Sequence, residues 1–106
     1  MKIDIKATNL DLTEVLKEYV EEKIGALAKF LKRWDPEGVV EAWVEIGRTT
    51  KHHHKGNVFR AEADLRVPGK VLRAEDEDFD IRVAVDRVRD KLKREVKKYK
   101  ELKRLS

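Results

Sequence analysis

The order of hydrophobic periodicities along the chain constrains its fold most, because helical and strand-like patterns follow one another. Two segments, at about residues 13–34 and 81–102, carry apolar residues at steps of three and four, as amphipathic helices do. The first apolar stripe is Leu16, Val20, Ile24, Leu27, Leu31 and Trp34, and the second is Ile81, Val85, Val88, Leu92, Val96 and Tyr99. Each predicted helix therefore has one face to bury.

Four other segments alternate apolar and polar residues, which predicts strands with one buried side and one side facing solvent. They cover residues 1–7, 40–46, 59–67 and 71 to about 75. Between the last two, Val67-Pro68-Gly69-Lys70 predicts a tight turn, because proline fixes one φ angle and glycine accepts a positive one. The predicted order is β-α-β-β-β-α. We expect an α+β fold in which both helices pack on one face of a four-stranded sheet.

Length and composition exclude several classes of protein. The 106 residues are enough for one modest core, so we predict a single domain over residues 1–106. No apolar run approaches the roughly 18 residues of a membrane-spanning helix, and the alternating N-terminus does not resemble a signal peptide. The absence of cysteine excludes disulfides, thiolate zinc sites and cysteine nucleophiles. These features predict a cytoplasmic protein.

Charge is distributed unevenly along the chain. Residues 81–106 contain 11 Lys and Arg against 4 Asp and Glu, a net charge of +7. Residues 1–80 contain 14 Lys and Arg against 17 Asp and Glu, a net charge of −3. Basic charge gathered in one segment indicates a polyanionic partner there.

Two rows of basic residues follow the predicted C-terminal helix away from its apolar stripe. The first row is Arg87, Lys91, Arg94 and Lys98, and the second is Lys93, Lys97, Lys100 and Arg104. In both rows the spacing places the residues along one side of the helix. We expect them to contact a phosphate backbone. The alternative is a solvated helix whose basic residues suit the negative end of the helix dipole.

Other polar clusters have simpler explanations than catalysis. His52, His53 and His54 could bind a metal ion, but a solvated loop tip is the favoured interpretation. The acidic cluster at residues 75–80 could hold Mg²⁺, but acids before a helix also cap its free N–H groups, which we favour. Trp43 falls on the solvent side of its strand, where it could stack on a base, although we expect neighbours such as Arg60 to cover it partly.

Two sets of residues, one near each end, resemble a known family. The N-terminal set has Asn9 in the turn, followed by Leu12-Thr13-Glu14, Leu16, Tyr19-Val20 and Lys23; the C-terminal set has Ala74-Glu75, Asp80, Ala84-Val85-Asp86, Asp90-Lys91-Leu92, Arg94 and Lys97. In this order they resemble the ribosome hibernation-promoting factors, also called ribosome-associated inhibitor A, protein Y or sigma-54 modulation protein. The resemblance covers essentially the whole chain, although the middle strands match only by pattern and length.

The chain departs from this family in two places. Arg82 and Val83 stand where the family usually has a Tyr-Ala pair, and the loop with His52 to His54 is unlike most members. Long members carry a linker and a C-terminal domain that dimerises ribosomes, to which nothing here corresponds. The resemblance therefore implies a short form or the N-terminal part of a long form.

The resemblance also implies a fold and a function. The family's fold is similar to double-stranded RNA-binding domains, with two helices on one sheet face. Its members are stress-linked translation inhibitors that sit between the head and body of the small ribosomal subunit. There they cover the places where messenger RNA and the A-site and P-site transfer RNAs bind.

Charge pattern and resemblance agree on RNA as the partner, and the predicted action is occlusion without catalysis. We therefore predict no enzymatic activity, cofactor, metal, membrane or small-molecule substrate. The predicted RNA-binding residues are, in order, Arg87, Lys91, Arg94 and Lys98, then Lys93 and Lys97, and then Lys23, Lys29, Lys32 and Arg33. The alternatives are a stand-alone double-stranded RNA-binding module and a small metal-dependent nuclease that uses the acids or histidines.

Overall fold

The computed structural model of the chain describes residues 1–49 and 58–105. Its elements are β1 (Lys2–Thr8), α1 (Glu14–Gly25), the 3₁₀ segments η1 (Ala26–Phe30) and η2 (Lys32–Trp34), β2 (Glu41–Arg48), β3 (Phe59–Val67), β4 (Lys70–Asp78) and α2 (Ile81–Leu105). In the part that is described, the four strands form one sheet in the order β1-β2-β3-β4. The predicted α+β fold with the order β-α-β-β-β-α is confirmed.

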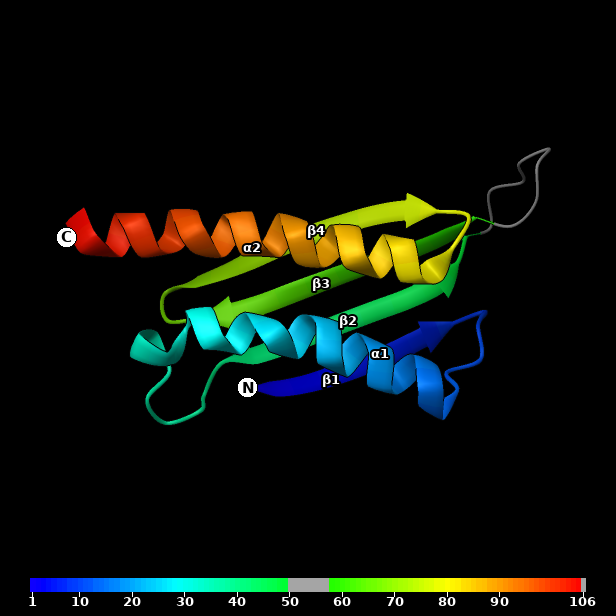
Figure 1. Cartoon of the computed structure of the whole chain (residues 1–106), viewed down its shortest axis with the longest axis horizontal. Helices are drawn as coiled ribbons and strands as arrows, with labels where there is room; N and C mark the ends of the chain where they lie inside the picture. Colours follow the sequence, from blue (N-terminus) through cyan, green and yellow to red (C-terminus); the bar gives the residue numbers. More distant parts are fainter. Residues whose placement is uncertain (50–57, 106) are drawn as a thin grey trace.

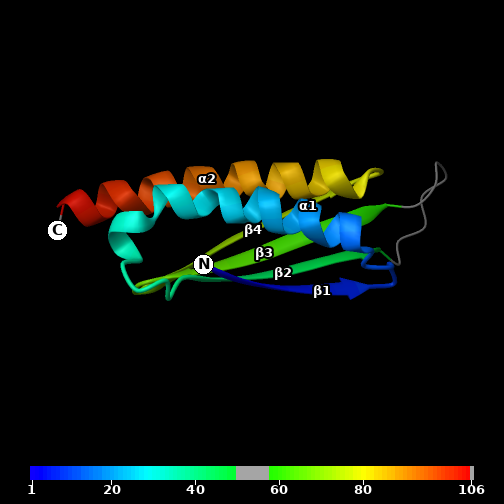
Figure 2. The ribbon, with the colours of Figure 1, turned by 60° about the horizontal axis from the view of Figure 1, so that its bottom comes forward.

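The sheet is mixed, and its helices lie on one side. Strand β1 pairs with β2 in parallel, an arrangement that requires a crossover connection, and here the crossover contains α1. The pairs β2 with β3 and β3 with β4 are antiparallel. Helices α1 and α2 run side by side over the same face of the sheet (Figure 1). The turned view shows both helices above the sheet and its other face uncovered (Figure 2).

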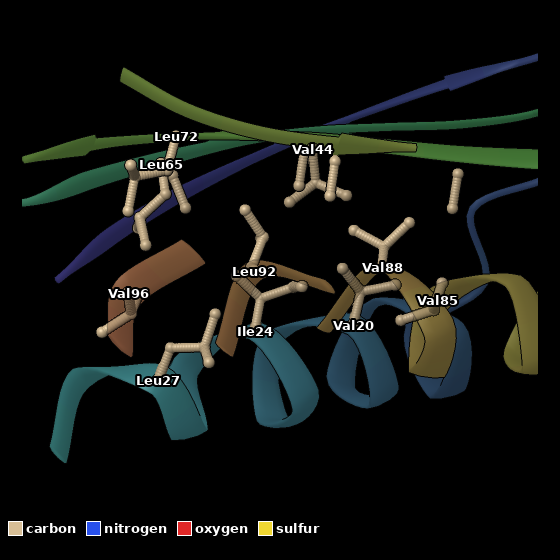
Figure 3. Close-up of a cluster of buried hydrophobic side chains, with 14 of the residues drawn as sticks. Val20, Ile24, Leu27, Val44, Leu65, Leu72, Val85, Val88, Leu92 and Val96 are labelled. Carbon is tan, nitrogen blue, oxygen red and sulfur yellow. The ribbon is translucent and has the colours of Figure 1, made fainter. Parts of the chain in front are cut away.

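The core lies between the two helices and the sheet (Figure 3). Val20 and Ile24 of α1 and Leu27 of η1 lie beside the α2 residues, and both sets point toward the sheet. The α2 contribution consists of Ala84, Val85, Val88, Leu92, Val96 and Tyr99, all buried. Both predicted stripes therefore face the sheet, which leaves the polar sides of the helices toward solvent.

Local signals in the sequence set the ends of the elements. The Thr13 hydroxyl accepts a hydrogen bond from the Leu16 N–H at 3.2 Å and caps α1. An Asp80 carboxylate oxygen accepts one from the Arg82 N–H at 2.9 Å, which confirms helix capping for this member of the acidic cluster. Gly69 has a φ of 79° in the turn between β3 and β4, as the Pro-Gly pair predicts.

The prediction of one continuous helix over residues 13–34 is wrong. α1 ends at Gly25, and the chain continues as η1 and η2. Backbone N–H groups there bond to carbonyls three residues back, as from Leu31 to Ala28 (3.0 Å) and from Trp34 to Leu31 (2.9 Å). Apolar steps of three and four fit both helix types, so the pattern does not distinguish them. Glycine, a poor helix former, stands where the helix type changes.

The predicted end of the last strand, at about residue 75, is also too early. β4 continues to Asp78, paired with β3 through Phe59. The acids at 75–78 therefore belong to a strand, where successive side chains alternate between the two faces. At the other end, α2 reaches Leu105, beyond the predicted Leu102.

Trp43 is partly covered, as predicted, but by Arg66 and not by Arg60. The Arg66 guanidinium lies over the indole ring, 4.5 Å from its centroid, and Trp43 keeps 45% of its surface exposed. Arg60 binds Glu62 and Glu75 instead. The strand register explains this, because Trp43 is paired with Asp64 and lies diagonal to Arg66, whereas Arg60 is opposite Gly47.

Two further features concern the limits of the described chain. His52 to His54, the histidine run considered as a metal site, lie outside the described residues. Within residues 1–49 and 58–105, no helix combines the length and apolar character needed to cross a membrane.

Candidate nucleic-acid interface

The uncovered face of the sheet mixes acidic and basic residues, and its arginines Arg60 and Arg73 are paired with acids. Arg60 lies 3.0 Å from a Glu62 oxygen and also contacts Glu75. The Arg73 Nε lies 3.4 Å from Asp64 Oδ1. Because acidic residues lie among its cations, this face is a poor match for a polyanion, so the helix layer on the opposite face is the candidate interface.

One side of α2 faces strand β4. We call the first basic row, Arg87, Lys91, Arg94 and Lys98, the β4 flank. Arg87 Nη1 lies 3.2 Å from Asp78 Oδ1 and 3.9 Å from Asp76 Oδ1. Lys91 Nζ lies 3.1 Å from Asp76 Oδ2 and donates a hydrogen bond to the Glu75 carbonyl at 2.8 Å. The acids that end β4 therefore neutralise half of this row.

The pKa of Asp76 reflects these contacts. Burial by itself raises the pKa of this carboxyl. The hydrogen bonds from Lys91 and the Glu77 N–H, together with the charges of Lys91 and Arg87, outweigh burial and hold the pKa below its usual value. Asp76 is therefore an ionised partner of the β4 flank at neutral pH.

The other side of α2 faces the 3₁₀ segment η1. We call the second basic row, Lys93, Lys97, Lys100 and Arg104, the η1 flank. The ammonium groups of Lys93 and Lys100 lie 5.3 and 5.9 Å from the centroid of the Phe30 ring. Lys29 of η1 adds a third ammonium at 5.1 Å. Among the described residues, no member of the η1 flank has a carboxylate within salt-bridge distance.

Basic residues of the first helical region join this surface through aromatic rings. Trp34 of η2 packs edge-on against Tyr99 of α2, with ring centroids 6.3 Å apart. The Arg33 guanidinium carbon and the Lys100 Nζ lie 5.6 and 5.5 Å from the centroid of the Trp34 ring. The two helical regions therefore share one basic surface.

At the other end of the helix layer, Tyr19 joins α1 to α2. Its hydroxyl donates a hydrogen bond to Asp86 Oδ1 at 2.7 Å. Burial, followed by this bond and the Asp86 charge, raises the pKa of Tyr19 to about 12. The Lys23 Nζ and the Arg82 guanidinium carbon lie 5.4 and 5.2 Å from the centroid of the Tyr19 ring. Arg82, which departs from the family pattern together with Val83, thus belongs to the basic surface although it is not among the predicted RNA-binding residues.

The predicted site residues fall into two groups. Arg87 and Lys91 are ion-paired with β4, and Lys98 lies 3.7 Å from Glu95 on its own helix. The other predicted site residues have no carboxylate within salt-bridge distance in the described chain. They are Arg94, Lys93, Lys97, Lys23, Lys29, Lys32 and Arg33. The place of Phe30 among these cations is not predictable from the sequence, because the position of an aromatic residue in a helical pattern does not show which cations lie near its ring.

The arrangement provides positive charge and aromatic surface for binding. In the described residues, no three His, Asp or Glu side chains are placed to hold a metal ion. The β4 acids Asp76 and Asp78 have basic partners instead. The helix layer is therefore suited to contacts with phosphates and exposed rings.

Comparison with known proteins places the chain in a family. The family model described as sigma 54 modulation protein / S30EA ribosomal protein matches residues 3–104. A ribosome hibernation promotion factor of Deinococcus radiodurans is 32% identical over 97 residues, which cover 91% of this chain and 47% of the relative. Its Lactococcus lactis counterpart is 33% identical over 102 residues, 94% of this chain and 50% of the relative. The chain thus spans about half the length of these curated relatives.

Solved structures agree with this assignment. The N-terminal domain of Thermus thermophilus Protein Y has a TM-score of 0.74 and 32% identity, covering 93% of this chain and 99% of that one. A ribosomal subunit interface protein from Coxiella burnetii, at 21% identity and a TM-score of 0.73, shows the same fold over 95% of this chain and 99% of its own. The chain therefore belongs to the sigma 54 modulation protein / S30EA ribosomal protein family.

Proposed function

We propose that this protein binds the small ribosomal subunit through its helix layer and inhibits translation as a ribosome hibernation factor in the cytoplasm. The observation that carries this proposal is the η1 flank, a row of cations without carboxylate partners among the described residues. Ribosomal RNA offers the dense phosphate surface that such a row requires. The printed names of the relatives and the family membership support the same partner.

The proposed mechanism is occlusion without a chemical step. Lys and Arg contact mostly phosphates, so binding follows the shape of the RNA more than its sequence. The 25 residues of α2 extend over about 37 Å, long enough to contact several successive phosphates. Held in this way, the domain would cover the path of messenger RNA and the A-site and P-site transfer RNAs.

The structure suggests an order of importance among the proposed contacts. We place Lys93, Lys97 and Arg94 first because they are not ion-paired within the described chain. Lys29, Arg33 and Lys23 extend the same surface through their aromatic contacts. Lys32 precedes Arg33 in η2. Arg87, Lys91 and Lys98 contribute less, since contact with phosphate must compete with their present acidic partners.

Co-sedimentation with purified small subunits and whole ribosomes, over a series of salt concentrations, tests this function. We expect saturable binding that weakens as salt rises, together with inhibition of translation of a reporter messenger RNA in a cell-free system. An excess of free RNA duplex should not displace the protein. Absence of binding by folded protein at physiological salt would contradict the proposal. Displacement by any duplex would favour a stand-alone double-stranded RNA-binding module.

A further inference from the structure

Three ammonium groups from two separate elements surround one aromatic ring at the edge of the helix layer. Lys29 comes from η1, and Lys93 and Lys100 come from α2. Their Nζ atoms lie 5.1, 5.3 and 5.9 Å from the centroid of the Phe30 ring. Attraction between a cation and an aromatic face holds each ammonium near the ring. The same ring therefore gathers three like charges into a small volume.

These three charges are not balanced locally. In residues 1–49 and 58–105, no carboxylate lies within salt-bridge distance of Lys29, Lys93 or Lys100. Like charges held close together repel, and an anion placed among them removes the repulsion and gains attraction to all of them. The opposite flank shows the contrast, because there Asp76 and Asp78 supply the anions from within the fold.

A hollow of about 330 Å³ opens beside the ring. It is lined by Phe30, Lys93, Arg94, Val96, Lys97 and Lys100. Phe30 is half-buried, so part of its ring remains open to solvent. The hollow thus combines an aromatic surface and an aliphatic floor with four basic side chains at its margin.

We propose that this hollow binds one unpaired ribonucleotide, with its phosphate beside the ammonium groups of Lys93 and Lys100, which line it, and its base against Phe30. The proposal rests on the proposed function in treating the helix layer as the RNA-binding surface. It adds a specific ligand, because a phosphate row alone would not require an accessible ring. In a duplex the bases are stacked and paired, whereas an unpaired base can turn out and stack on an aromatic side chain.

The first test compares two leucine substitutions. Phe30→Leu removes the ring of the hollow, and Phe79→Leu removes a ring that is 56% exposed and lies outside it, between β4 and α2. The probes are a fluorescein-labelled ten-nucleotide oligouridine and an abasic strand of the same length, with affinities measured by anisotropy. Phe30→Leu should weaken oligouridine binding about tenfold, as expected for one lost base–aromatic contact, and change abasic-strand binding less than twofold. Phe79→Leu should change neither.

The second test removes the cations while keeping the ring. Lys93→Gln with Lys100→Gln should weaken binding of both strands about tenfold, since both carry phosphates. The matched control, Lys2→Gln with Lys6→Gln, removes the same charge from exposed positions of β1 and should change binding less than twofold. This pair keeps the proposal testable if Phe30→Leu fails to fold by circular dichroism.

The outcomes separate this proposal from the proposed function. Equal effects of Phe30→Leu and Phe79→Leu would overturn the nucleotide site, and so would a loss by Phe30→Leu that is the same for the oligouridine and the abasic strand. In the second test, equal losses for the two lysine pairs would overturn it as well. Co-sedimentation of the parent with small subunits in the same experiments decides the proposed function separately. A selective loss by Phe30→Leu in a protein that does not bind subunits would support the hollow and contradict the ribosomal partner.

Discussion

The two flanks of α2 have similar charge in the sequence and differ in the fold. Arg87 and Lys91 on the β4 flank form ion pairs with Asp76 and Asp78. On the η1 flank, Lys93 and Lys100 lie over Phe30, with no carboxylate at salt-bridge distance in the described chain. The comparison teaches that the residues of a basic row keep their charge unpaired where the neighbouring element supplies no acid. That information resides in the packing of β4 and η1 against the helix.

The largest expected effect comes from a change that removes the packing shared by both flanks. Leu92 is fully buried between α2 and the sheet, and Leu92→Ala should lower the free energy of unfolding by about 3 kcal/mol through lost burial and a cavity. Urea denaturation measures this loss. The matched control is Leu105→Ala, because Leu105 is 85% exposed and its loss should cost less than about 0.5 kcal/mol. Equal losses would contradict the position of α2.

The next prediction separates the flanks by stability. Arg87→Gln with Lys91→Gln leaves Asp76 and Asp78 without their basic partners, so the free energy of unfolding should fall by about 1.5 kcal/mol. Lys93→Gln with Lys97→Gln removes the same charge from the η1 flank and should cost less than about 1 kcal/mol, since only the contact of Lys93 with the Phe30 ring is lost and no carboxylate loses its partner. Equal destabilisation by the two pairs, measured by urea denaturation, would remove the distinction between the flanks.

A smaller effect is expected at the contact that joins α1 to α2. Tyr19→Phe removes the hydrogen bond to Asp86 and should cost about 1 kcal/mol of unfolding free energy at pH 7. Because the pKa of Tyr19 is raised to about 12 in the fold, its contribution is present below pH 10 and disappears as the pH rises toward 12. The difference between parent and variant should therefore shrink over that range in urea denaturation. A constant difference would contradict this assignment.

The smallest expected effect comes from removing one acidic partner of the β4 flank, so that its basic residues become unpaired like those of the η1 flank. Asp76→Asn releases Lys91 and partly Arg87, and we expect affinity for small subunits to rise about threefold, the gain of a fraction of one phosphate contact. Binding titrations measure this gain. Unchanged or weaker binding would show that these pairs do not limit the flank.

The same variant gives a pH test of the ion pairs. The folded pKa of Asp76 lies below its unfolded value of about 3.9, so its stabilising contribution is present above that pH and is lost as the pH falls through the folded pKa. Asp76→Asn should therefore be less stable than the parent at neutral pH, and this deficit should shrink as the pH falls below about 4. A deficit that stays constant as the pH falls would contradict an ionised Asp76 as its source.

Much of the fold is predictable from the sequence because its signals are local. Alternation defines the strands, the two apolar stripes define the faces of the helices that meet the sheet, and Thr13 and Gly69 mark a helix start and a turn. The change to 3₁₀ helix after Gly25 is not predictable in this way, since steps of three and four suit both helix types. That change determines where Lys29 and Phe30 lie relative to α2.

The candidate site is predictable in composition but not in organisation. Helical spacing identifies both basic rows. It does not show that Asp76 pairs with Lys91, because that contact depends on how far β4 extends and how α2 crosses it. Nor does it show that Lys29 and Lys93 share one ring, since this contact joins residues far apart in the sequence. Long-range packing therefore decides which of the predicted cations have an acidic partner within the fold.

The salt dependence of binding to small subunits tests the central claim most directly. Affinity would be measured by co-sedimentation at several salt concentrations for the parent, for Lys93→Gln with Lys97→Gln, and for Lys2→Gln with Lys6→Gln. The slope of log affinity against log salt should shrink by about two for the η1-flank pair and stay unchanged for the β1 pair. Equal slopes for all three proteins would contradict binding of RNA by the helix layer.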